Sequence, residues 1–469
     1  MNLIIYLIAF LEWFTTLSVE IVALRQFTPI IGSNSISTSI ILWVVLLALS
    51  AGYYRWWIIA DRTDDIKKRL WQNLIISSMY YAFISFIFYE FVLEWLLQST
   101  WSYFLSVLLT SIILFFIPVF FASQTIPLLS SLLTWAWKAE SIWKLLFYST
   151  LWSFLGSVAT STVLFPLLGA DKTAFVSPFF LTLCSILLCV FFLKNTKLLV
   201  LSGFLSALYL FIITFSSPLS SGILYQSSNA YQDVRISENT DAGYRVFSLD
   251  DAYSSGIEIY SWESFFPYIQ EVKSFVQDEK PKRILLIGAA GFTFPQEVSY
   301  YDYVEQIDVV DIDPHLRGLT EKYFLQQELS SKINFIPEPS RYFLSSSDTS
   351  YDMIFVDVYA GKSIPAQVLT REFFEHLNLK SESIYLNLVL DPSLDTRLSR
   401  SIVATLLHVF SEIYYKNMGL ENKQITNFIF TNNPKEKYIE AIWDWWNIYT
   451  DDKHNIEYDK FLFEQEWYR

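Results

Sequence analysis

The chain has 469 residues, of which 53% are hydrophobic and 18% aromatic, and its formal net charge is −14. Its mean hydropathy of +0.32 conceals two different halves. Up to residue 219 there are 11 Lys and Arg against 9 Asp and Glu, whereas the remainder holds 22 against 38. Such an acidic half is a poor partner for nucleic acid and for anionic lipid headgroups. It suits cationic small molecules such as amines, unless the acidity serves solubility alone.

Cysteine and histidine provide no framework for a disulfide network or a metal site. The two cysteines, Cys184 and Cys189, lie in one apolar run, so they do not reveal the compartment. The four histidines, at positions 315, 376, 408 and 454, have no metal-ligand spacing. We therefore expect no bound metal.

Seven apolar stretches in the N-terminal half are long enough to cross a bilayer as helices. They lie near residues 3–24, 36–60, 74–97, 103–123, 145–168, 174–193 and 198–215. The first is too long for a cleaved signal peptide, so we expect a retained helix. The sequence thus predicts a transmembrane domain over residues 1–217, with the lipid bilayer as its partner, in the bacterial inner (plasma) membrane.

Basic residues in the loops set an orientation. They follow the second, fourth and sixth stretches, at Arg62, Lys67, Lys68, Arg69, Lys138, Lys144, Lys194 and Lys197. By the positive-inside rule these loops are cytoplasmic, and seven crossings then place the C-terminal domain outside. The result reverses if one stretch does not cross, and the fourth, which contains Pro118, is the weakest of the seven.

Four acids fall within the apolar stretches: Glu12, Glu20, Glu90 and Glu94. Because an intramembrane acid is costly, it marks a functional site by default. These acids either face a polar cavity, pair with Arg25 or Arg55, or cap helix ends near the interface. The sequence leaves these alternatives open.

Residues 218–469 show the pattern of an α/β domain. Two alternating stretches, 233–238 and 244–249, predict a hairpin, which forms a small N-terminal β element. Buried strands with helical segments between them are predicted at residues 284–287, 307–311, 333–336, 353–356 and 383–388. The fold class is therefore an α-helical transmembrane bundle of about seven helices fused to a Rossmann-like α/β domain with a doubly wound sheet.

The predicted strand ends carry the chemistry. The turn from Gly288 to Gly291 permits close approach of the backbone to a ligand. Asp311, with Asp313 beside it, stands at the end of the second strand, where an acid can accept ribose hydroxyls. Asp357 ends the fourth strand at the same edge of the sheet, so it is a candidate general base or amine ligand, or else a residue that orders the following loop.

Several motifs stand in a recognisable order. They are Tyr231-Gln-Asp-Val-Arg-Ile, Leu249-Asp, Leu286-Ile-Gly-Ala-Ala-Gly, Val310-Asp-Ile-Asp-Pro, Tyr351-Asp-Met-Ile-Phe-Val-Asp, Ser363-Ile-Pro-Ala and Leu369-Thr-Arg-Glu-Phe-Phe. In order and spacing they resemble the polyamine aminopropyltransferase (spermidine synthase) family over roughly residues 225 to 390. Residues 20–25 and 47–53 are similar to the membrane segment of membrane-bound spermidine synthase-like proteins.

The resemblance implies transfer of an aminopropyl group from decarboxylated S-adenosylmethionine to an amine such as putrescine, which leaves methylthioadenosine. Gln232 and the Gly288 turn would then hold the donor, Asp311 its ribose, and Asp357 would take the proton of the attacking amine. The donor would be a co-substrate rather than a tightly bound cofactor.

Several carboxylates of the family pattern are absent. Gly291 replaces the Asp of the glycine-rich turn, and Ala360 replaces the second Asp of the Asp-x-x-Asp motif. Residues 266–268, Phe-Pro-Tyr, stand where the family has Tyr-His-Glu, and Glu338 matches the position before the adenine-contacting Asp. The nucleoside site is therefore better supported than the amine site.

Two alternatives remain open at the level of sequence. One is a methyltransferase-like enzyme that uses S-adenosylmethionine itself. The other is a non-catalytic nucleoside- or polyamine-binding membrane protein. We expect a small-molecule amine as acceptor and no nucleic acid as partner, and the sequence is compatible with a homo-oligomer.

Overall fold

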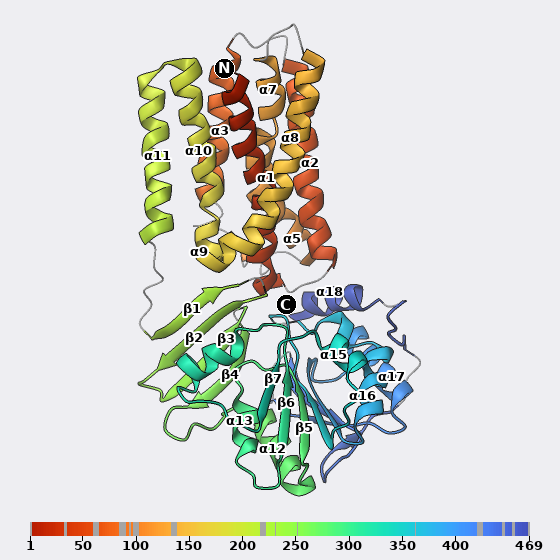
Figure 1. Ribbon diagram of the computed structural model, residues 1–469. Coiled ribbons are helices and arrows are strands. Elements are labelled where there is room, and N and C mark those ends of the chain that lie inside the picture. Colours follow the sequence, from red (N-terminus) through yellow and green to blue (C-terminus); the bar gives the residue numbers. More distant parts are fainter. Residues whose placement is uncertain are drawn as a thin grey trace.

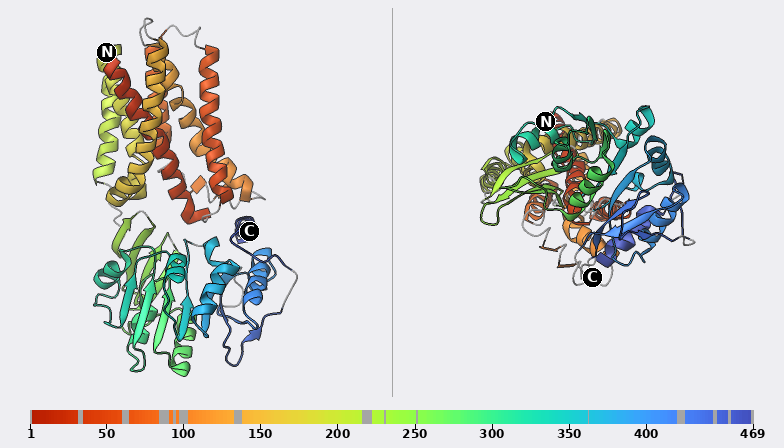
Figure 2. Two further views of the ribbon diagram at one scale, coloured as in Figure 1. Left: turned by 45° about the vertical axis from the view of Figure 1, so that its right-hand side comes forward. Right: turned by 90° about the horizontal axis from the view of Figure 1, so that it is seen from below.

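The two halves of the protein lie end to end (Figure 1). The structure is a computed structural model, and it describes residues 2–31, 35–59, 65–83, 91–92, 95–96, 103–132, 138–215, 222–229, 231–250, 252–361, 363–419, 425–442, 446–452 and 455–467. A bundle of helices forms one half and an α/β domain the other, with the N-terminus at the far end of the bundle (Figure 1). Helix α18 (Ile456–Trp467) returns to the interface between the halves and packs against the bundle (Figure 2).

The bundle consists of long apolar helices, several of which contain a π-helical turn. Its elements are α1 (Asn2–Ile31), α2 (Ser35–Ile59), α3 (Ile66–Phe83), α5 (Tyr103–Ser111), η3 (Ile112–Phe116), α6 (Ile117–Ala122), α7 (Thr125–Ser131), α8 (Lys138–Ala159), η5 (Thr160–Leu164), α9 (Phe165–Thr173), α10 (Val176–Leu188), η6 (Cys189–Leu193) and α11 (Thr196–Phe215).

Six stretches of the described chain are long and apolar enough to cross a membrane. They are Leu3–Gln26, Ser35–Trp56, Phe104–Ser130, Phe147–Thr173, Val176–Leu193 and Thr196–Phe215. The expected third crossing, residues 74–97, falls on α3 and on residues outside the described part. Helix α3 packs against α6 and α10, but it begins with Lys67, Lys68 and Arg69 and is not among the six. Six of the seven expected spans thus have a counterpart among the described residues, and the third stays a prediction.

The basic helix ends lie on one side of the bundle. Helices α3, α8 and α11 all begin at the end farthest from the α/β domain (Figure 1). Among the intramembrane acids, Glu12 is buried, and the Thr16 hydroxyl lies 3.5 Å from its carboxylate. Glu20 is half-buried, and Glu90 and Glu94 lie outside the described residues.

A small antiparallel sheet joins the bundle to the α/β domain. Its strands pair in the order β1 (Ile223–Ser228), β2 (Asp233–Asn239), β3 (Tyr244–Leu249) and β4 (Ala252–Glu258). The structure thus places four strands where the sequence predicts two. Strand β4 escapes a sequence-based prediction because Ser and Gly, which are weak strand formers, occupy its centre.

The main sheet has eight strands in the order β12-β10-β11-β9-β8-β5-β6-β7. They are β5 (Arg283–Ile287), β6 (Gln306–Val310), β7 (Ile333–Ile336), β8 (Met353–Val356), β9 (Ile384–Leu390), β10 (Tyr414–Asn417), β11 (Thr426–Thr431) and β12 (Ile439–Glu440). Strands β5 to β9 are parallel, whereas β10, β11 and β12 pair antiparallel. The Rossmann-like fold is confirmed, but its sheet is mixed.

Helices cover both faces of this sheet. They are α12 (Pro267–Glu279), α13 (Thr293–Ser299), α14 (Leu316–Leu319), η7 (Thr320–Phe324), α15 (Ser340–Ser346), η8 (Ala366–Val368), α16 (Arg371–Lys380) and α17 (Arg397–Val409). One core packs α12 and α13 around Phe275, Phe294 and Phe355, and the other packs α16 and α17 around Phe373 and Ile402. These cores fix the carboxyl ends of the parallel strands, which meet at one edge.

Candidate functional site

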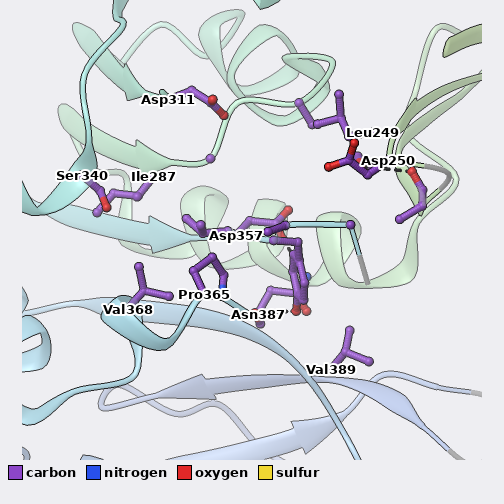
Figure 3. A pocket seen from close by; sticks show the side chains of 18 of the residues that line it. Leu249, Asp250, Ile287, Asp311, Ser340, Asp357, Pro365, Val368, Asn387 and Val389 are labelled. Atoms are coloured by element: carbon purple, nitrogen blue, oxygen red, sulfur yellow. Dashed lines mark hydrogen bonds between the residues drawn. The ribbon is translucent and has the colours of Figure 1, made fainter. Parts of the chain in front are cut away.

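A cleft of about 840 Å³ lies at the carboxyl ends of β5, β6 and β8 (Figure 3). Strand β5 pairs with β6 on one side and with β8 on the other, so the chain reverses its winding direction here. Such switch points are where open α/β sheets bind ligands. Of the predicted site residues, five line this cleft: Gln232, Gly288, Asp311, Glu338 and Asp357.

Gly288 brings two strand ends together. It has a φ of +98°, and a Cβ atom at this position would lie 2.0 Å from the Asp357 carbonyl oxygen. Only glycine tolerates both the backbone conformation and the close approach. The turn after β5 therefore packs directly against the end of β8, and both Gly288 and Asp357 line the cleft.

Asp311 lies in the cleft directly after β6, held by two backbone groups. Its Oδ2 accepts a hydrogen bond from the Ala289 N–H at 2.9 Å, and its Oδ1 accepts one from the Asp313 N–H at 3.1 Å. Burial raises the pKa of Asp311 despite these hydrogen bonds. The two hydrogen bonds thus fix the orientation of the carboxylate at the end of β6. Its remaining lone pairs can accept hydrogen bonds from the hydroxyl groups of a ligand.

Asp357 stands between two neutral donors. Its Oδ1 accepts a hydrogen bond from the Asn387 side chain at 2.8 Å, and its Oδ2 accepts one from the Tyr268 hydroxyl at 3.1 Å (Figure 3). Shielding from water raises the pKa of Asp357 to about 6, although both hydrogen bonds favour the ionised form. A carboxylate with this pKa is ionised at neutral pH and is well placed to accept a proton.

Tyrosines surround this carboxylate without adding charge. Burial and the negative charge of Asp357 raise the pKa of Tyr268 well above its usual value, so its hydroxyl stays protonated. Burial likewise raises the pKa of Tyr359, whose hydroxyl donates to the Asn387 carbonyl at 2.9 Å. Asp357 is therefore surrounded by the neutral polar side chains of Tyr268, Tyr359 and Asn387.

Two predicted binding residues, Gly291 and Asp313, do not line the cleft. A Cβ atom at Gly291 would lie 2.4 Å from the Phe324 ring, so packing explains why this position has no carboxylate. Asp313 is fully buried, and its Oδ2 accepts hydrogen bonds from Asn229 at 2.6 Å and from Gln232 at 3.1 Å. It therefore holds Gln232 in place rather than facing a ligand.

Sequence reasoning missed two polar neighbours of Asp357. Tyr268 comes from α12, which is far from β8 in the sequence, so only packing reveals the contact. Asn387 left a usable signal, because it is a polar residue inside the otherwise apolar strand Ile384–Leu390. Within the described residues, no three His, Cys, Asp or Glu side chains cluster in a way that could hold a metal ion.

Comparisons with known proteins agree with this geometry. The model of the spermine/spermidine synthase domain matches residues 269–434. A polyamine aminopropyltransferase of Vibrio vulnificus (strain CMCP6) is 28% identical over 248 residues, which are 50% of this chain and 81% of that protein. Putrescine N-methyltransferase 3 of Nicotiana tabacum is 28% identical over 160 residues, 33% of this chain and 40% of that protein.

Among solved structures, spermidine synthase from Thermotoga maritima aligns with a TM-score of 0.37 and 18% identity, covering 52% of this chain and 87% of that one. The family model and the sequence relatives coincide with the part of the chain that builds the cleft. Over residues 269–434, the chain therefore carries a spermine/spermidine synthase domain.

Proposed function

We propose that this protein is a membrane-bound aminopropyltransferase, which transfers an aminopropyl group from decarboxylated S-adenosylmethionine to an amine. The observation that carries the proposal is the position of Asp357 between Tyr268 and Asn387, in the same cleft as Asp311. The cleft thus offers an acid for a ribose on one side and a base for an amine on the other.

The donor would lie over the turn after β5. Asp311 would accept the ribose hydroxyls, Glu338 at the end of β7 would face the adenine, and Gln232 would cover the nucleoside. The lining residues around this side include Ile287, Val310 and Pro339, which suit an apolar base and a thioether.

The proposed reaction is a displacement at carbon. The amine nitrogen attacks the aminopropyl carbon bound to the sulfonium, the carbon–sulfur bond breaks, and its electron pair stays on sulfur as neutral methylthioadenosine. The nitrogen loses one proton, which Asp357 accepts. Holding both reactants in one cleft removes much of the entropic cost of such a step.

The acceptor side is less acidic than the family pattern. Ala360 replaces a second carboxylate, and the groups around Asp357 are the neutral side chains of Tyr268, Tyr359 and Asn387. An acceptor that needs one carboxylate rather than two fits this wall better than putrescine does.

Methyl transfer from S-adenosylmethionine is the second candidate. The observation in its favour is Gly291, where packing against Phe324 leaves no space for the carboxylate that would bind the ammonium group of an aminopropyl donor. The similarity to a putrescine N-methyltransferase points the same way.

Product analysis distinguishes these functions. Purified full-length protein is incubated with decarboxylated S-adenosylmethionine or with S-adenosylmethionine and a panel of amines, and the nucleoside products are identified by mass spectrometry. Methylthioadenosine with an aminopropylated amine supports the proposal. Adenosylhomocysteine with a methylated amine supports the second candidate. If the protein binds methylthioadenosine but forms neither product, the result supports the non-catalytic alternative.

We also propose that the six apolar stretches and helix α3 cross a bacterial inner membrane, which makes seven crossings, and that the cleft lies on its non-cytoplasmic side. The basic starts of α3, α8 and α11 gather at the opposite end of the bundle, and the positive-inside rule makes that end cytoplasmic. Reporter fusions at residue 220 that are active only in the cytoplasm would contradict this orientation.

A further inference from the structure

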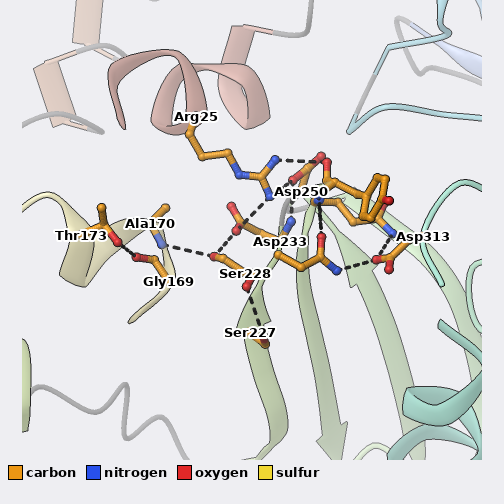
Figure 4. Close-up of polar contacts among 12 residues, drawn as sticks. Arg25, Gly169, Ala170, Thr173, Ser227, Ser228, Asp233, Asp250 and Asp313 are labelled. Atoms are coloured by element: carbon orange, nitrogen blue, oxygen red, sulfur yellow. Dashed lines mark hydrogen bonds and ion pairs between the residues drawn. The ribbon is translucent and has the colours of Figure 1, made fainter. Parts of the chain in front are cut away.

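A membrane helix reaches the edge of the candidate site. Arg25, near the end of α1, places its Nη2 atom 3.1 Å from Asp233 Oδ1 and 3.4 Å from Asp250 Oδ1 (Figure 4). Its Nη1 atom donates to the Tyr231 carbonyl at 3.3 Å. The side chains of Arg25 and Asp250 are largely shielded from solvent, at 13% and 7% exposed, whereas that of Asp233 is 30% exposed.

Two of the three partners of Arg25 line the cleft. Tyr231 and Asp250 line it, together with Gln232, which lies between Tyr231 and Asp233 in the chain. The Asp233 N–H donates to Asp250 Oδ1 at 2.8 Å, and the Asp250 N–H donates to the Asp233 carbonyl at 2.9 Å. Strands β2 and β3 are thus tied together at the point where Arg25 contacts them.

The negative charges of Asp233 and Asp250 make the contact between β2 and β3 depend on the Arg25 cation. Two carboxylates, Asp233 and Asp250, lie close enough to share one guanidinium group. Without that cation they would repel each other in a partly desolvated place. Asp250 also has a φ of +47°, a conformation that a non-glycine residue keeps only when its surroundings hold it.

A second membrane helix contacts the same network. Gly169 kinks α9 with a φ of +79°, and the following Ala170 N–H donates to the Ser228 hydroxyl at 3.2 Å. Ser228 in turn donates to Asp233 Oδ1 (Figure 4). Helices α1 and α9 therefore converge on Asp233 from the bundle.

We propose that Arg25 is a positioning residue of the nucleoside site and that the membrane half completes this site. Arg25 holds Asp250 and the Tyr231 backbone, and Asp313 holds the Gln232 side chain, so that Gln232 stays over the cleft. The inference rests on the proposed function, because it takes the adenosyl donor as the ligand of the cleft. The contacts of Arg25 with Asp250 and Tyr231 thus connect the bundle to residues that line the cleft.

Calorimetric titration of the full-length protein in detergent with methylthioadenosine tests the inference. Arg25→Ala should bind roughly tenfold or more weakly than wild type, because two carboxylates lose their shared cation. Arg25→Lys keeps the charge but not the forked geometry, so it should recover part of the loss. If Arg25 acts through Asp250, the losses in Arg25→Ala and Asp250→Asn should not add in the double variant.

Glu457→Gln is the matched control. The Glu457 carboxylate accepts a hydrogen bond from the Ser35 N–H at 2.8 Å, so it also joins the two halves, but it does not line the cleft. This variant should bind methylthioadenosine as wild type does. Equal affinity of Arg25→Ala and wild type would overturn the inference, and so would equal losses in Arg25→Ala and Glu457→Gln.

The outcomes separate the inference from the proposed function. A wild-type protein that does not bind methylthioadenosine contradicts the proposed nucleoside site itself. A wild-type protein that binds it and an unaffected Arg25→Ala variant contradict only the role of Arg25. Thermal unfolding shows whether Arg25→Ala folds. If it does not, the methylthioadenosine affinities of Arg25→Lys and Glu457→Gln are compared instead. The inference predicts weaker binding by Arg25→Lys, and equal affinities would contradict it.

Discussion

Asp357 titrates under two opposing influences, and their balance can be measured. Shielding from water raises its pKa to about 6, whereas an Asp carboxyl group in an unfolded chain has a pKa of 3.8. The folded state therefore binds the proton more tightly than the unfolded state does. It follows that ionised Asp357 destabilises the fold above pH 6, and that this penalty disappears as the pH falls toward 4.

We predict that Asp357→Asn is more thermostable than wild type at pH 8, because the amide removes a shielded charge. The difference in Tm should shrink as the pH is lowered from about 6 to 4, where wild-type Asp357 becomes neutral. Thermal unfolding of both proteins over this pH range is the measurement. A difference that does not change with pH would mean that Asp357 has an ordinary pKa.

Asp311 makes a separate prediction about ligand binding. If it accepts the ribose hydroxyls, Asp311→Ala should weaken methylthioadenosine binding by roughly 1.5–3 kcal/mol, about ten- to a hundredfold in affinity. Asp352→Ala is the control, since Asp352 accepts hydrogen bonds from Lys282 N–H and Arg283 N–H at the opposite end of the sheet. Equal affinities of Asp311→Ala and wild type in calorimetry would place the nucleoside elsewhere.

At the scale of single elements, the buried parallel strands were predictable. Strand β8 has the bounds that its apolar run predicts, Met353–Val356, because a strand covered on both faces is apolar throughout. Strand β7 also has its predicted bounds, Ile333–Ile336, although it lies at the sheet edge and Asn334 in it is exposed. The antiparallel edge was not predictable from such runs. Strand β10 is only partly buried and β12 has two exposed residues, so neither leaves a continuous apolar signal.

The candidate site also has parts that the sequence predicts and parts that it does not. Asp311 and Asp357 follow apolar strands directly, so position alone predicted that they would share one edge of the sheet. The contact of Tyr268 with Asp357 depends on how α12 packs, and the burial of Asp313 depends on the β1–β2 loop. Neither follows from local sequence, because each joins segments more than 80 residues apart.

The turn after β5 carries a prediction of its own. Gly288→Ala would place a Cβ atom against the Asp357 carbonyl in a backbone conformation that alanine avoids, so we expect a loss of roughly 1–3 kcal/mol in stability. Gly318→Ala in α14 is the control, since a Cβ atom there meets nothing within 4 Å. Thermal unfolding that ranks the two variants equally would contradict the close approach of β5 and β8.

For the whole molecule, the sequence predicts the division into an apolar and an acidic half, and the described elements divide between α11, which ends at Phe215, and β1, which begins at Ile223. The third expected crossing is the hardest to predict from the sequence, because α3 combines a basic start with a polar, tightly packed interior. That Arg25 contacts the acidic half was not predictable from the sequence, where pairing with an intramembrane acid is only one of the open alternatives.

A fragment of residues 220–469 should fold without the membrane half. Both sides of its sheet have a complete apolar core, which is sufficient for a domain of this size. It should unfold cooperatively in the absence of detergent, yet bind methylthioadenosine more weakly than the full chain, since Arg25 is missing. A fragment without a cooperative transition would contradict its independence.

The central claim is that the cleft catalyses group transfer with Asp357 as the base. Its most direct test is the release of methylthioadenosine from decarboxylated S-adenosylmethionine and an amine panel, by wild type and Asp357→Asn side by side. Loss of a general base typically lowers the rate by a factor of about 10² to 10⁴. We therefore predict release by wild type and none detectable from Asp357→Asn, while both proteins bind methylthioadenosine. Release at an equal rate from Asp357→Asn, or none from a wild type that binds the nucleoside, would contradict the claim.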